Sequence, residues 1–190
     1  MNSFNNFSDM PQIPYKILVH LIQNNENIFK LLKYNTSDAL SKPNLTVAEK
    51  MALLYIDGDK ENEYNIFLKP LIGDEIIKGC SQLRLYKATI QPTDHLTALL
   101  NYEFDIICGE KIGLVYDEND IPCTRIDLIE KELLNELNGL DAFGVGYFQF
   151  NKALSRTCSE QLRLSNSKTF YGASLILAVN YSTIKGDVCG

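Results

Sequence analysis

The amino-acid sequence predicts an α+β fold, with a mainly antiparallel β-sheet of about four strands, a long helix packed on one face and additional N-terminal helices. Apolar and polar residues alternate along 82–108 and 170–181, which indicates strands with two different faces. Apolar residues recur three or four positions apart within 15–32 and 124–139, which indicates helices. The resulting order of helices, two strands, helix and two strands is typical of the α+β class.

The bulk composition is that of one ordinary folded domain. The 190 residues suffice to bury a core, and we expect a single domain over 1–190. With 45% hydrophobic and 22% charged residues, the chain is not predicted to be disordered. The net charge of −6 argues against a nucleic-acid binder, because phosphate neutralisation requires a surplus of Lys and Arg.

The cysteines and the hydropathy indicate a soluble protein made in a reducing cytosol. The five cysteines are widely scattered and form no C-x-x-C pair, and the polar start MNSFNNFSDM lacks the layout of a secretion signal. The longest apolar runs, such as Leu175 to Val179, are too short to span a bilayer, so no membrane contact is expected.

The N-terminal third is predicted to be helical after a flexible arm at about 1–14. An apolar stripe from Ile17 to Ile22 resumes at Ile28, and the intervening Asn24-Asn25-Glu26 predicts two short helices with an Asn cap between them. Thr46 and Glu49 form a capping box that opens a further helix, expected to run to about Tyr55.

A long arm or loop is predicted over about 57–82. It begins with the polar stretch DGDKENEY and continues with apolar pairs separated by proline and glycine, without clear periodicity. A segment of this length without a pattern is uncommon inside a compact domain, so we expect it to meet another chain.

The centre of the chain is predicted to be a hairpin from Gln82 to Cys108 that turns at Pro92-Thr93-Asp94. In its second strand, the even-numbered residues from Leu96 to Cys108 are mostly apolar, while Asn101, Glu103 and Asp105 lie on a face predicted to be exposed to water. A strand of about a dozen residues is long for a globular sheet.

The remaining elements follow from local signals. Residues 109–119 are predicted to form a loop or a short hairpin extension. Thr124 is the expected N-cap of a helix that stops at Asn138-Gly139. Residues 144–150 and 170–181 are predicted strands.

Short motifs for ligand binding fail on their spacing. Gly144-x-Gly146 lacks the third glycine and the strand–helix context of a dinucleotide site, so a tight turn is favoured. Asp57-x-Asp59-x-Glu61 resembles the start of a calcium loop, but Asn62 and Leu68 replace the required glycine and glutamate. A solvated acidic loop is the better interpretation.

The two histidines do not predict a metal or a catalytic site. His20 lies beside an apolar helical stripe, where a core or boundary role is the default. A zinc site from His95, Cys80, Cys108 and Cys123 matches no common ligand spacing. No nucleophile motif is present. We therefore expect no cofactor and no metal.

Glu103 and Asp105 are the strongest candidates for acid–base chemistry. On one strand face their carboxylates are expected to lie about 7 Å apart, a separation that suits glycoside hydrolysis. The alternative is a wet strand face, or ion pairs with Lys87 across the hairpin. The alternative is favoured because no aromatic-lined cleft is apparent, so the protein is predicted not to be an enzyme.

Several segments together resemble the neck proteins of tailed bacteriophages. They are Tyr15 to Asn44, the LRLY stretch at 83–86, Pro122 to Gly139 and the Gly144-Val145-Gly146 that follows. The tail-terminator, or head–tail joining (connector), group is the most similar. The resemblance covers most of the chain through diffuse motifs, and it offers no catalytic residue to carry over.

The resemblance implies a structural virion protein, made in the host cytoplasm, that forms a ring of copies of itself, commonly hexameric, at the neck or tail end. The ring closes the tail tube or joins it to the head connector, beside neck, connector and tail-tube proteins. DNA would pass through its lumen without specific binding. Candidate lumen or inter-subunit residues are Asp57, Asp59, Glu61, Lys87, Glu103 and Asp105. Alternatives are another head-completion or neck component, or a small non-enzymatic α+β binding module.

Overall fold

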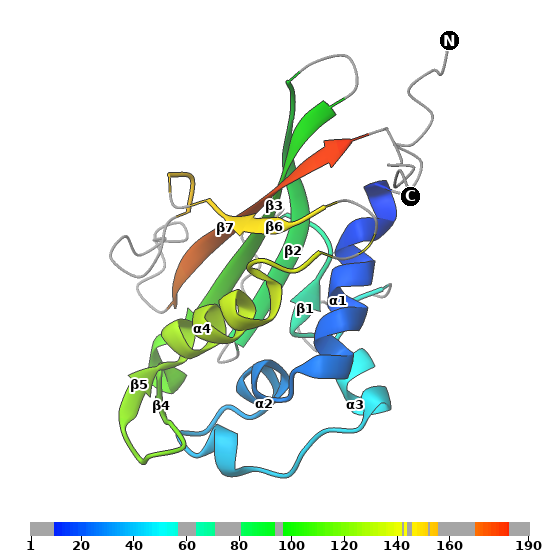
Figure 1. The fold of residues 1–190 in the computed structure, drawn as a ribbon. Helices are drawn as coiled ribbons and strands as arrows, with labels where there is room; N and C mark the ends of the chain where they lie inside the picture. Colours follow the sequence, from blue (N-terminus) through cyan, green and yellow to red (C-terminus); the bar gives the residue numbers. More distant parts are fainter. Residues whose placement is uncertain are drawn as a thin grey trace.

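The computed structural model describes residues 10–56, 64–70, 81–93, 97–141, 143, 146–151, 153–155 and 170–182. Their helices are α1 (Ile13–Asn24), α2 (Asn27–Lys33), η2 (Ala39–Ser41), α3 (Val47–Met51), η4 (Glu110–Ile112) and α4 (Arg125–Leu137). Their strands are β1 (Ile66–Phe67), β2 (Ser81–Pro92), β3 (Thr97–Gly109), β4 (Leu114–Tyr116), β5 (Pro122–Thr124), β6 (Phe148–Phe150) and β7 (Phe170–Ser182). The α+β class predicted from the sequence is confirmed (Figure 1).

The main sheet is mixed and has five strands, in the order β1-β2-β3-β7-β6. The three contacts β2–β3, β3–β7 and β6–β7 are antiparallel, as predicted, but β1 runs parallel to β2. The sequence did not predict β1, because Ile66 and Phe67 are too short a run to show an alternation. β4 and β5 form a separate short hairpin, which is one of the two forms expected for this region.

The long strands β2, β3 and β7 place one row of apolar side chains toward the helices. Leu85 lies opposite Phe104, and Phe104 lies opposite Leu175, in the strand register. These residues belong to the same buried cluster as Ile17 of α1, Phe29 of α2, and Ile129 and Leu133 of α4. Burial of these side chains provides most of the favourable free energy of folding.

The helix boundaries follow the predicted caps. Asn25 Oδ1 accepts a hydrogen bond from the Ile28 amide at 2.9 Å, and Thr124 Oγ1 accepts one from the Asp127 amide at 3.1 Å. Gly139 follows α4 with φ of +85°, a conformation that glycine adopts without strain. The capping box of Thr46 and Glu49 is also formed.

Two predicted elements are shorter than expected. α3 ends at Met51 rather than near Tyr55, because the chain turns extended and the Tyr55 amide donates to the Ile66 carbonyl at 2.9 Å. β6 begins at Phe148 rather than at 144, because Phe143 and Gly146 have positive φ angles that a strand does not accommodate.

The predicted arms fall mostly outside the described residues, which exclude 1–9, 57–63 and 71–80. Within the described part, Met10 is buried and α1 begins at Ile13. Among the described residues, no helix combines the length and apolar character needed to cross a membrane.

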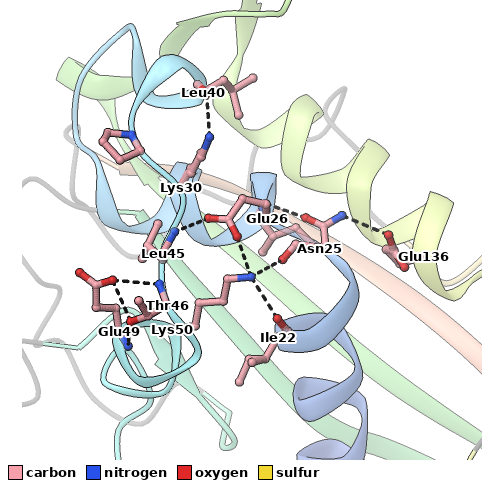
Figure 2. A network of polar contacts seen from close by, with 12 residues as sticks. Ile22, Asn25, Glu26, Lys30, Leu40, Leu45, Thr46, Glu49, Lys50 and Glu136 are labelled. Carbon is pink, nitrogen blue, oxygen red and sulfur yellow. Dashed lines mark hydrogen bonds and ion pairs between the residues drawn. The ribbon is translucent and has the colours of Figure 1, made fainter.

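Two buried cations tie the helices together. Lys50 Nζ donates to the carbonyls of Ile22 and Asn25, at the end of α1, and pairs with Glu26 Oε2 at 2.8 Å (Figure 2). Arg125, at the start of α4, donates hydrogen bonds to four backbone carbonyls. Leu31 lies near the end of α2, Tyr34 and Thr36 follow α2, and Ile112 lies in η4. Each cation satisfies carbonyls that a helix or turn leaves without a partner.

Candidate functional site

The second face of the main sheet, which points away from the core cluster, carries a group of polar side chains. We call this group the sheet cluster. It consists of Gln82, Arg84 and Tyr86 of β2, Glu103 and Asp105 of β3, and Ser174 of β7. The register explains the grouping, since Arg84 and Ser174 lie on either side of Asp105, and Tyr86 lies opposite Glu103.

Both carboxylates of the sheet cluster accept hydrogen bonds from hydroxyl groups on neighbouring strands. The Tyr86 hydroxyl donates to Asp105 Oδ2 at 2.9 Å, and Ser174 Oγ donates to Glu103 Oε1 at 2.5 Å. Arg84 Nη2 donates to Gln82 Oε1 at 3.1 Å, and the Arg84 guanidinium lies 5.0 Å from the centre of the Phe67 ring. The cluster therefore contains three hydrogen-bonded pairs that lie next to one another across three strands.

This second face is not wet, which corrects the prediction. Arg84 is 5% exposed, Asn101 is 1% exposed, and Glu103 and Asp105 are half-buried. Ile107 and Ile176 on the same face are also buried. The alternation along β3 distinguishes the two faces correctly. However, alternation shows which residues are polar and not which are exposed, because a polar residue with hydrogen-bond partners can be buried at little cost.

Burial changes the acid–base behaviour of this cluster. Loss of solvent raises the pKa of the Asp105 carboxyl, and the nearby Glu103 charge acts in the same direction, while the Tyr86 hydrogen bond opposes them. Burial, followed by the Asp105 charge, raises the pKa of the Tyr86 hydroxyl well above its ordinary value. Tyr86 is therefore a hydrogen-bond donor at neutral pH, and Asp105 takes up a proton more readily than an exposed aspartate.

A carboxyl whose pKa is raised by folding makes the folded state more stable at low pH, where the carboxyl is protonated. This stabilisation begins to fall as the pH rises above the unfolded pKa of about 4, and it is lost once the pH passes the folded pKa. We therefore expect Asp105→Asn to raise the melting temperature near pH 7, by about 2–4 °C for each kcal/mol gained. The gain should vanish toward about pH 4.

Thermal unfolding followed by circular dichroism across this pH range measures the effect. Asp141→Asn, at an exposed aspartate, serves as the control with the same change of charge. A lower melting temperature for Asp105→Asn near neutral pH would show that the hydrogen bond from Tyr86 outweighs the burial of the charge.

The other predicted site residues are not in this cluster. Lys87 is exposed, lies opposite Tyr102 in the register, and contacts Met10 Sδ at 3.2 Å, so it does not pair with Glu103 or Asp105. The expected ion pair is wrong because Lys87 belongs to the opposite face, next to a bulge between Lys87 and Thr89. Asp57, Asp59 and Glu61 lie outside the described residues.

The remaining candidates for metal binding are not assembled either. Cys80 and His95 lie outside the described residues, and the described part of the chain contains no group of three or more metal-binding side chains. His20 is a boundary residue as expected, with its ring edge-on to Phe143 and its Nε2 3.7 Å from Glu136 Oε2.

Sequence reasoning missed Arg84, Tyr86 and Ser174 as members of the sheet cluster. The available signal was weak: Arg84 and Tyr86 share a parity, but their pairing with Asp105 and Glu103 depends on the hairpin register. Ser174 comes from a strand more than sixty residues away, so nothing local connects it to Glu103.

The fold and the sheet cluster define a small α+β protein whose central sheet is buried on both faces along much of β3 and β7. The chain belongs to the YomW family, whose pattern matches residues 25–179. The members of this family are proteins encoded in phage regions of Bacillus, which indicates that this protein is phage-encoded. A comparison with curated proteins finds no match.

Proposed function

We propose that this phage-encoded protein is a non-enzymatic structural component of the virion neck. Copies of it form a ring, expected to be hexameric, that closes the tail tube or joins it to the head connector. The protein is made in the host cytoplasm and is then incorporated beside neck, connector and tail-tube proteins. Its membership of a phage family and its resemblance to neck proteins support this role.

The observation that carries the proposal is an unfinished edge of the sheet. β1 pairs with β2 at Leu83 and Arg84 only, so the outer edge of β2 from Tyr86 to Pro92 has no strand partner among the described residues. Figure 1 shows this end of the β2–β3 hairpin extending beyond the helices, and Ile90 there is 41% exposed. An unpaired edge with an exposed apolar residue offers a place where another chain can pair.

The sheet cluster supports a structural rather than a catalytic role. Glu103 and Asp105 each accept a hydrogen bond from a hydroxyl group of the same sheet, so both carboxylates are already engaged by neighbouring strands. Their half-burial also makes them weak candidates for a ring lumen, and the candidate acids at 57–61 lie outside the described residues. DNA would pass an overall acidic ring without specific binding, because electrostatic affinity requires neutralised phosphates.

Labelling of intact particles tests the proposed function. Antibodies against the protein, visualised with gold by electron microscopy, should mark the junction between head and tail. Deletion of the gene should give full heads and separate tails. Particles that assemble normally and do not contain the protein would contradict the proposal and would favour a small binding module. Labelling elsewhere in the head would identify another head-completion component.

A further inference from the structure

The short β4–β5 hairpin presents an exposed apolar surface. Leu114 is 62% exposed, Tyr116 is 49% exposed, and Ile121, just before β5, is 54% exposed. Val115 between them is buried in the core, so alternation along β4 places Leu114 and Tyr116 on the outer face. The register that pairs Tyr116 with Pro122 places Ile121 opposite Asp117, so Ile121 lies on the other side of the hairpin from Leu114 and Tyr116. Two neighbouring exposed apolar side chains on one face, Leu114 and Tyr116, are characteristic of an interaction site.

The turn that joins β4 to β5 adds negative charge to this surface. Asp117 Oδ1 accepts hydrogen bonds from the amides of Asn119 and Ile121, both at 2.8 Å, which hold the turn in shape. These bonds lower the pKa of the Asp117 carboxyl. Glu118 and Asp120 are exposed and have no ion-pair partner among the described residues. The hairpin thus carries apolar side chains beside a rigid acidic turn.

A groove of about 370 Å³ on another part of the molecule has the complementary character. It lies along most of α1 and is lined by Tyr15, Lys16, Val19, His20, Gln23 and Phe143. Tyr15 is 45% exposed, so an aromatic ring is available at its mouth. Lys16 has no ion-pair partner among the described residues, so the groove combines apolar walls with one unpaired cation.

We propose that the β4–β5 hairpin of one copy docks into this groove of the next copy. Leu114 and Tyr116 enter between the apolar walls, and Glu118 lies against Lys16. The occupant is a second copy of this chain, because the hairpin supplies apolar side chains and carboxylates within a few residues of each other. Complementary charges of this kind select a partner and fix its register.

The positions of the two surfaces determine the type of assembly. In Figure 1 the β4–β5 hairpin lies at the lower left and α1 runs along the right, so the two surfaces lie on different sides of the molecule. A contact between two different surfaces is head-to-tail, and it builds closed rings where the rotation between copies closes. This inference rests on the proposed ring and names the contact between its subunits.

A charge-exchange experiment tests the contact. We expect Lys16→Glu and Glu118→Lys each to weaken self-association by about tenfold, because each places like charges together. The double variant should associate about tenfold more tightly than the two separate losses predict, since the pair is restored in reverse. Leu114→Ser should weaken association similarly through its lost apolar contact. Sedimentation velocity over a concentration series measures all four variants.

The controls separate folding, contact and function. Lys33→Glu makes the same change of net charge on α2, outside both surfaces, and should leave association unchanged. Circular dichroism confirms that each variant is folded. The docking would be overturned if the double variant lost as much affinity for itself as the two single variants together. It would also be overturned if the wild-type chain stayed monomeric at the highest concentration. The protein's presence at the neck of particles would still support the proposed function in either case.

Discussion

Replacing Arg125 by methionine is expected to lower the free energy of unfolding by about 3–5 kcal/mol, since several buried carbonyls lose their donor at about 1–3 kcal/mol each. The melting temperature should fall by roughly 10 °C, given the usual relation for a chain of this length. The change should leave the fold class intact, because the methionine side chain is apolar and similar in length.

The expected loss comes from the carbonyl groups that Arg125 serves. Its side chain is fully buried, and its guanidinium donates to the carbonyls of Leu31, Tyr34, Thr36 and Ile112. Replacing both sides of a buried polar contact by apolar groups is often neutral, but backbone carbonyls cannot be replaced. Methionine removes the donors and leaves the acceptors, of which only the more exposed ones regain water.

Denaturant unfolding of three variants distinguishes this account from a simple packing effect. Arg125→Lys keeps a charge but offers fewer donors, so it should fall between the wild type and Arg125→Met. Lys131→Met, at an exposed position of the same helix, is the control and should cost less than about 1 kcal/mol. If Arg125→Met were as stable as Lys131→Met, the carbonyl network would contribute nothing measurable.

The parts of this fold that the sequence predicts are those held by interactions between residues close together in the chain. The starts of α3 and α4 are predictable because Thr46 and Thr124 bond to amides three residues away. The strands β3 and β7 are predictable because their apolar residues alternate over a long stretch. β1 is not predictable, because the pairing that defines it, with Leu83 and Arg84 of β2, is set by the tertiary fold.

The sheet cluster was predictable only in part, for the same reason. The shared parity of Glu103 and Asp105 places them on one face, as the structure shows. Their partners depend on the register between strands. That register pairs Lys87 with Tyr102, so Lys87 alternates with Tyr86 and lies on the other face; the bulge comes after it, between Lys87 and Thr89. Arg125 and Lys50 gave no signal at all, because a basic residue in a short helix normally faces solvent.

Replacing Lys50 by methionine is the second large expected effect, a loss of about 2–4 kcal/mol in the free energy of unfolding. Lys50 is 6% exposed and holds the end of α1 through the Ile22 and Asn25 carbonyls, at 3.0 and 3.1 Å (Figure 2). A cation at a helix C-terminus also complements the helix dipole. The loss should be smaller than for Arg125, because Glu26 keeps its hydrogen bond from the Leu45 amide.

A double-mutant cycle separates the ion pair from the carbonyl contacts. Glu26→Gln removes the charge and retains an acceptor for the Leu45 amide, so alone it exposes the cost of leaving Lys50 unpaired. Combined with Lys50→Met, it should cost less than the sum of the two single losses, with a coupling energy of about 1–3 kcal/mol. The loss that remains after the coupling is subtracted belongs to the helix-end carbonyls.

The chain contains a matched surface pair for comparison. Lys33 and Glu49 lie 3.6 Å apart with side chains 35% and 48% exposed, whereas the side chains of Lys50 and Glu26 are 8% and 24% exposed. The cycle of Lys33→Gln and Glu49→Gln should therefore give a coupling energy below about 1 kcal/mol, and glutamine preserves the capping box. Equal coupling energies for the two pairs would show that burial of Lys50 does not strengthen its interaction with Glu26.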